Sequence, residues 1–150
     1  MHVQPPVQAE PQTLTFVVPG EPVPQPRARI VTKGKKSWGF TPPEHPIHAY
    51  RAGIAVTAKA AGATVTEDAV SVTIAATFGR PKSHLNKSGL KKTAPLMPHK
   101  DVDNLAKAVL DALTGVAWHD DKQVASLQIV KSYGTAGATE VTIAELSGNV

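Results

Sequence analysis

Five of the twelve acidic residues of this chain fall between positions 101 and 121. Asp101 and Asp103 are separated by one residue, and Asp120 and Asp121 are adjacent, so four of the carboxylates form two close pairs. The segment before them, residues 79–100, contains six lysines or arginines and no acidic residue. Clustered carboxylate oxygens suit a hard cation such as Mg²⁺, and a basic surface suits a polyanion. The combination predicts a metal-dependent enzyme that acts on nucleic acid.

Basic residues are concentrated in two segments that contain no acidic residue, 22–43 and 79–100. These segments hold eleven of the sixteen lysines and arginines, so their placement is more informative than the modest formal charge of +4. Segregated positive charge is typical of a surface that binds phosphate groups, although two solvated surface loops would have the same composition. The residues predicted to contact nucleic acid are Arg27, Arg29, Lys33, Lys35, Lys36, Arg80, Lys82, Lys100 and, beside the acidic pair, Asn104.

The elements that must position these side chains follow from hydrophobic periodicity. Residues 69–78 alternate apolar and polar side chains, which indicates a half-buried strand, and residues 47–61 repeat apolar side chains at helical spacing. The predicted order is strand 14–18, helix 47–61, strand 69–78, helix 103–114, and strands 123–131 and 139–146, the last two joined as a hairpin by a turn at 134–137. Residues 21–45 and 79–100 are expected to be extended, functional loops.

This β-α-β-α-β-β order favours an α+β fold, a single domain over residues 13–150 with a mixed β-sheet and two main helices packed on one face. A chain of 150 residues is long enough to bury a core without disulfides, and it contains no cysteine. Residues 1–12 contain scattered prolines and lack the apolar stretch of a secretory signal, so we expect a disordered tail. No apolar run approaches the roughly 20 residues that span a bilayer, and we expect no membrane partner.

The helix predicted at 103–114 has two distinct faces when its residues are placed at about 100° intervals. One face carries Val102, Leu105, Ala106, Val109 and Leu113 for the core, and the opposite face carries Asp103, Asn104, Lys107 and Asp111. Two interpretations without catalysis stay open for the polar face. Asp101 or Asp103 could serve as the N-cap, and Lys107 could form i,i+4 ion pairs with Asp103 and Asp111. For Asp111 we favour the ion pair.

Other metal sites fit the sequence poorly. An EF-hand loop requires a glycine where Ala106 stands, and no glutamate closes such a loop here. A zinc site is disfavoured because the chain has no cysteine and its histidines lack a paired helical spacing. His119 is a candidate ligand or general base, although we favour a bystander near the acidic pair. Trp38, among basic residues, either stacks on a base or packs a loop or a subunit contact.

The run from Asp101 to Val124, DVDNLAKAVLDALTGVAWHDDKQV, closely resembles the signature of the RusA-type Holliday junction resolvases, many of which are encoded by phages and prophages. The likeness extends more weakly to residues 19–29 and 78–82. The resemblance implies a homodimeric endonuclease, dependent on Mg²⁺ or Mn²⁺, that binds four-way DNA junctions. It would nick two opposed strands symmetrically during recombination, repair or phage DNA processing, in a bacterial or phage-infected cytoplasm and without a small-molecule cofactor.

The resemblance also implies roles for individual residues. It assigns catalysis to Asp101, Asp103, Lys107 and Asp121, and metal binding to Asp101, Asp103 and Asp121, with Asp120 as a further ligand. These roles agree with the chemistry of phosphodiester hydrolysis, because carboxylate-bound Mg²⁺ activates water and stabilises negative charge. Two alternatives remain: a nuclease for forks or flaps, and a non-catalytic junction-binding protein. The acidic cluster argues against the latter, since carboxylates without a metal repel phosphate.

Overall fold

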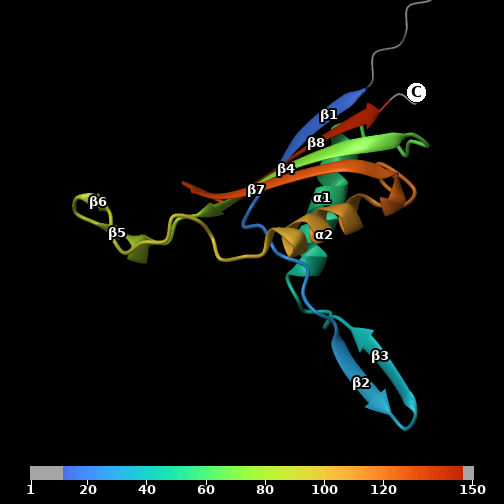
Figure 1. The fold of residues 1–150 in the computed structure, drawn as a ribbon, viewed down its shortest axis with the longest axis horizontal. Helices are drawn as coiled ribbons and strands as arrows, with labels where there is room; N and C mark the ends of the chain where they lie inside the picture. The colour runs from blue at the N-terminus through green and yellow to red at the C-terminus, as the bar shows by residue number, and fades with distance from the viewer. Residues whose placement is uncertain (1–11, 147–150) are drawn as a thin grey trace, which may run out of the picture.

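The computed structural model describes residues 12–146, in which a four-stranded sheet has the order β1-β8-β4-β7. Its strands are β1 (Thr13–Pro19), β4 (Ala69–Gly79), β7 (Val124–Gly134) and β8 (Ala138–Leu146). Two helices, α1 (Ile47–Ala60) and α2 (Val102–Leu113), lie on the same side of this sheet (Figure 1). Strand β8 runs antiparallel to β1 and β4, whereas β4 and β7 are parallel. The expected α+β fold with a mixed sheet is therefore confirmed.

Two small hairpins extend from this body (Figure 1). Strands β2 (Arg29–Lys33) and β3 (Lys36–Phe40) pair with each other inside the segment that was expected to be an irregular loop. We call residues 29–40 the β2–β3 arm. The second basic segment contains a 3₁₀ turn, η1 (Lys82–His84), and the very short pair β5 (Leu85–Asn86) and β6 (Gly89–Leu90). The tail expected at residues 1–12 lies almost wholly outside the described residues.

The hairpin predicted between β7 and β8 is wrong. Strand β4 lies between them, so the connection at residues 134–137 passes over the end of β4 and reaches its far side. The glycines at both ends of this connection let its backbone lie close to β4 and to Glu21. A Cβ on Gly134 would lie 2.6 Å from the Thr77 side chain, and one on Gly137 would lie 2.7 Å from the Glu21 backbone. The two glycines allow a tight crossing and do not mark a hairpin turn.

The core lies between the sheet and the two helices. Strand β4 buries alternate residues from Val70 to Phe78, as its sequence pattern predicts, and α2 buries the predicted face at Leu105, Ala106, Val109 and Leu113. Val102 is an exception: it is the first residue of α2 and is 40% exposed. Complete burial of a leucine or valine side chain contributes about 1.5–3 kcal/mol, so this face fixes the orientation of α2 on the sheet.

A buried polar pair joins α1 to the sheet. The hydroxyl of Tyr50 lies 2.6 Å from Oγ1 of Thr139, a residue with no exposed surface. Burial raises the pKa of Tyr50 above its ordinary value of 10.0, and the hydrogen bond to Thr139 opposes this shift. The phenol therefore stays protonated at neutral pH and satisfies Thr139. None of the helices in residues 12–146 has the length and apolar character needed to cross a membrane.

Candidate active site

The first acidic pair lies where the chain enters α2. Asp101 is the N-cap residue, with extended backbone angles of φ −71° and ψ 131°, yet its side chain makes no capping hydrogen bond within the described residues. Asp103 lies in the first turn, where its Oδ1 accepts a hydrogen bond from the Asn104 backbone at 2.9 Å. Both aspartates are exposed. The positive end of the helix dipole favours negative charge here, but helix capping does not explain two carboxylates.

Two contacts from distant parts of the chain hold this entry to α2. The ammonium of Lys131, on β7, donates to the carbonyl of Lys100 at 2.8 Å, immediately before Asp101. On the other side, the backbone N–H of Gln25 donates to the Asn104 carbonyl at 2.9 Å. Sequence analysis did not select either residue. Lys131 had a detectable signal, because its register partner on β4 is the buried Ala76, and lysine is rare on a core-facing position.

Lys107 and Asp111 form the expected i,i+4 ion pair, with Nζ and Oδ2 3.5 Å apart. Arg51, from α1, approaches the same carboxylate oxygen at 3.7 Å and donates to Oε1 of Gln25 at 3.4 Å. The interpretation of Asp111 as an ion-pair residue is confirmed. The Lys107 side chain is 60% exposed, and exposed pairs of this kind contribute about 0–1 kcal/mol. Its ammonium can therefore leave Asp111 for a phosphate at little cost.

The second acidic pair lies at the other end of α2 and has structural partners. Oδ1 of Asp121 accepts hydrogen bonds from Thr114 Oγ1 at 2.6 Å and Trp118 Nε1 at 3.5 Å. The Asp120 side chain accepts from the Lys122 backbone and forms a reciprocal capping box with Gln123 around the short helix η2 (Asp121–Gln123). These contacts fix the turn that leads from α2 into β7.

Gln123 and His119 complete this network. Gln123 Oε1 accepts from the backbone N–H groups of His119 and Asp120, and its Nε2 donates to the carbonyls of Thr66 and Asp68. Nε2 of His119 lies 2.7 Å from a Glu67 carboxylate oxygen. His119 therefore belongs to the turn before β7 and is remote from Asp101.

Topology separates the two acidic pairs. Because β4 and β7 are parallel and α2 connects them, α2 begins beyond the carboxyl end of β4 and ends near the amino end of β7. At about 1.5 Å per residue, α2 places Asp101 about 20 Å from Thr114, the partner of Asp121. Accordingly, residues 12–146 contain no group of three or more His, Cys, Asp or Glu side chains arranged to hold one metal ion. Asp101 and Asp103 provide the hard oxygen donors that Mg²⁺ prefers. Asp121 of the same chain lies at the other end of α2 and does not join them in one metal site.

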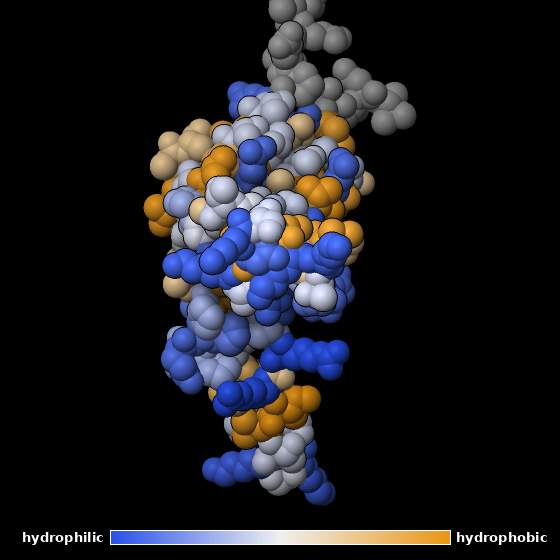
Figure 2. All heavy atoms as spheres, turned by 90° about the vertical axis from the view of Figure 1, so that its left-hand side faces the viewer, coloured by the Kyte–Doolittle hydropathy of each residue, from blue (hydrophilic) through white to orange (hydrophobic). Residues whose placement is uncertain are grey.

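Both basic segments approach the first acidic pair, because Pro26, beside Arg27, and Lys100 line the same cavity as Asp101. In the β2–β3 arm, Arg29, Lys33, Lys35 and Lys36 are exposed, as is Arg27 just before it. Figure 2 looks onto the face from which residues 80–100 project, and it shows a hydrophilic band across the middle of the molecule and hydrophilic side chains at the end of the arm. Lys82 and Lys100 are also exposed. Asn104 is half-buried at the start of α2.

Arg80 differs from the other predicted DNA contacts because its guanidinium has partners within the protein. It lies 4.1 Å from the centre of the Tyr133 ring and donates to the Pro95 carbonyl at 2.8 Å. These contacts fasten the basic loop to the end of β7. Trp38, on the arm, is 48% exposed beside Ile30, and this position is compatible with both of its proposed roles.

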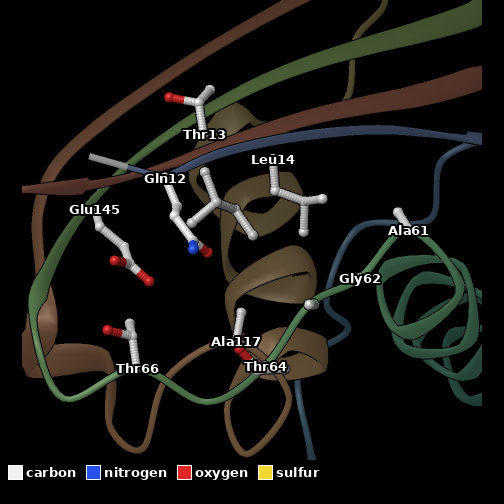
Figure 3. Close-up of a pocket in the computed structure, with 11 residues that line it drawn as sticks. Gln12, Thr13, Leu14, Ala61, Gly62, Thr64, Thr66, Ala117 and Glu145 are labelled. Carbon is white, nitrogen blue, oxygen red and sulfur yellow. The ribbon is translucent and has the colours of Figure 1, made fainter. Parts of the chain in front are cut away.

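Two cavities lie near the ends of α2. One, of about 230 Å³, is lined by residues such as Leu14, Gly62, Thr66, Ala117 and Glu145 (Figure 3). Glu145 is its one ionisable side chain among the described residues, so this cavity offers little for phosphodiester chemistry. The other, of about 420 Å³, adjoins Asp101 and Asn104.

The chain is similar to known proteins over most of its length. A family model described as "Endodeoxyribonuclease RusA" matches residues 19–144, which include both acidic pairs and both basic segments. The chain belongs to the RusA endodeoxyribonuclease family. It is also similar to the uncharacterized protein YqaN of Bacillus subtilis (strain 168), with 32% identity over 139 residues that cover 89% of this chain and 97% of the relative. The family is described as an endodeoxyribonuclease, an enzyme that cleaves DNA.

Proposed function

We propose that this RusA-family protein is a metal-dependent endonuclease that resolves four-way DNA junctions by paired nicks. The observation that carries the proposal is the exposed pair Asp101 and Asp103 at the start of α2, directly after one basic segment and beside a cavity that the start of the other also lines. Neither capping nor an ion pair among the described residues accounts for Asp101. Bound Mg²⁺ or Mn²⁺ would supply an activated water and neutralise the charge that develops on the phosphate.

The residues of the chain have distinct tasks in this proposal. Asp101 and Asp103 hold the cation, and Asn104 orients a carboxylate or a DNA phosphate. Lys107, one turn further along α2, leaves Asp111 and binds the scissile phosphate, where its charge stabilises the transition state. The exposed residues of the arm and of the loop at 80–100 bind the DNA backbone, as do Arg27 and Lys100. Arg80 contributes by holding that loop in place.

We further propose that Asp121 reaches the cation from a second copy of the chain. Within one copy the length of α2 keeps Asp101 about 20 Å from Thr114, which holds Asp121 by a hydrogen bond. In a two-fold dimer, each α2 start can meet the α2 end of the other copy, and the symmetry operation produces two equal sites. Two sites related by a two-fold axis suit a junction in which two opposed strands are cut. In this arrangement Asp120 binds no metal and stabilises the start of η2 as its N-cap.

The proposed function is tested with three DNA substrates of equal length: a mobile four-way junction, a replication fork and a linear duplex. In Mg²⁺ we expect symmetric paired nicks in the junction and little cleavage of the duplex, and in Ca²⁺ we expect binding without fast cleavage. Cleavage of the fork in preference to the junction would favour the fork or flap nuclease. Junction binding without cleavage in Mg²⁺ or Mn²⁺ would favour the non-catalytic alternative.

A further inference from the structure

The cavity of about 420 Å³ beside Asp101 is the feature that carries a further inference. It is lined by three separate segments of the chain: residues 23–26, His45 with Pro46, and the entry to α2 from His99 to Asn104. We propose that this cavity binds one nucleobase of the strand being cut, unstacked from its neighbours, beside the phosphate that reaches Asp101. The inference rests on the proposed function and names a subsite of that same site.

The walls of the cavity are fixed before any ligand arrives. Proline restricts the backbone at Pro24, Pro26 and Pro46, because its ring holds φ near −65°. Between the first two, Gln25 is tied to α2 by its backbone hydrogen bond to Asn104 and by the contact of its side chain with Arg51. A preformed cavity loses little conformational entropy on binding. Its volume lies within the range of about 300–1,000 Å³ that is common for ligand sites.

His45 gives the cavity a defined hydrogen-bond donor. Its Nδ1 accepts a hydrogen bond from the backbone N–H of Ile47 at 3.0 Å, so this nitrogen carries no proton. In the resulting neutral tautomer the proton is on Nε2. Nε2 has no hydrogen-bond partner within residues 12–146, and it can donate to an acceptor on the edge of a base. The imidazole ring also provides a flat surface of the kind on which unpaired bases stack.

The charges around the cavity favour a base over a phosphate group. Among the described residues that line the cavity, Lys100 carries a positive charge and Asp101 carries a negative charge. The two formal charges balance each other. A second phosphate in the cavity would find no excess of positive charge, because the cation proposed at Asp101 is engaged by the scissile phosphate. A neutral nucleobase needs no such charge, and it can contact the prolines and His45. Unpaired bases leave the stack at lower cost than paired bases, so such a subsite would favour substrates in which the protein opens base pairs at a branch point.

The variant that tests the proposal is His45→Asn. The Oδ1 atom of asparagine can accept the same hydrogen bond from Ile47, so the start of α1 is preserved while the imidazole ring is lost. The matched control is His48→Ala. His48 is near His45 on the chain, but its Nε2 contacts the carbonyl of Pro42 and it does not line the cavity.

The experiment combines these variants with junctions in which single bases next to the cleavage site are replaced, one at a time, by an abasic site. For the wild type, we expect one position at which base removal slows single-turnover cleavage by about 5- to 150-fold, the range for loss of one stacked base. His45→Asn should show this loss on the intact junction and no further loss at that abasic position, whereas His48→Ala should behave as the wild type. Absence of a sensitive position, or losses that multiply in His45→Asn, would overturn the proposal.

A second measurement does not depend on cleavage. With 2-aminopurine at the sensitive position, or at each position beside the junction centre if the protein binds without cutting, binding in Ca²⁺ should raise the fluorescence as the base leaves the stack. His45→Asn should reduce the rise and His48→Ala should not. An unchanged fluorescence in the wild type would refute the base subsite even if the nuclease activity is established, so the two proposals fail separately.

Discussion

The two ends of α2 carry similar acidic pairs in different environments. At the carboxyl end, Asp120 closes a capping box and Asp121 accepts hydrogen bonds from Thr114 and Trp118. At the amino end, Asp101 is exposed and caps nothing within the described residues, and the side chain of Asp103 accepts one exposed backbone N–H. The local fold thus explains the second pair and leaves the first without a structural task. A substitution at the amino end should therefore change chemistry, and one at the carboxyl end should also change stability.

The largest effect is expected from Asp103→Asn. Loss of a cation ligand should slow single-turnover cleavage by on the order of 1,000-fold, because the metal supplies several kcal/mol of transition-state stabilisation. Junction affinity in Ca²⁺ and the melting temperature should stay close to those of the wild type, since the side chain is exposed. If the free energy of unfolding fell by as much as the activation free energy rose, Asp103 would be a structural residue and the two helix ends would not differ.

The next prediction concerns a mixture of two inactive variants, Asp103→Asn and Asp121→Asn. A mixed dimer would contain one site with both substitutions and one site with neither, if Asp121 acts in the partner's site. We expect an equal mixture to recover about a quarter of the wild-type nicking rate, because about half of the dimers are mixed and each has one intact site. Cleavage of one strand per junction should accompany the recovery. If the mixture stays inactive while mixed dimers form, Asp121 does not complete the partner's site.

Lys107 and Asp111 form a matched pair for the third prediction. Lys107→Ala should reduce the single-turnover rate by about 100-fold, as expected when a charged group at the reacting phosphate is lost. Asp111→Ala breaks the same ion pair but keeps the ammonium, so its rate should stay within a few-fold of the wild type. Equal losses in the two variants would assign Lys107 to the ion pair and remove it from the catalytic site.

The smallest effect separates the two functions of Asp121. Asp121→Ala removes the acceptor for Thr114 and Trp118, and we expect it to lower the free energy of unfolding by about 1 kcal/mol. In a chain of this length such a change lowers the melting temperature by about 2–4 °C. Asp121→Asn keeps an oxygen acceptor and should melt near the wild type, yet both variants should lose cleavage. Cleavage by Asp121→Asn at the wild-type rate would leave this residue with a structural role alone.

Local sequence patterns predicted most of the elements correctly. Alternation identified β4, and helical spacing identified α1 and the buried face of α2, because these signals depend on which side of each element meets the core. Long-range features were not predicted. The position of β4 between β7 and β8 depends on pairing across the whole sheet. The order of residues placed the acidic pairs at opposite ends of α2, but it did not show that one chain keeps them too far apart to share a metal ion. Lys131 and the cavity near His45 arise from contacts between segments that are distant in sequence.

The parallel pairing of β4 with β7 places the long basic loop inside a single crossover connection, where it enters neither the main sheet nor the core. Closing a flexible loop costs only about 0.6 kcal/mol more for each doubling of its length. Insertions or deletions between Asn86 and Ala94 should therefore change the free energy of folding very little, because the contacts of Arg80 with His84 and Pro95 and that of Lys100 lie outside this range. In evolutionary terms, the reach and charge of this basic loop can vary almost independently of the scaffold that holds Asp101 and Asp103.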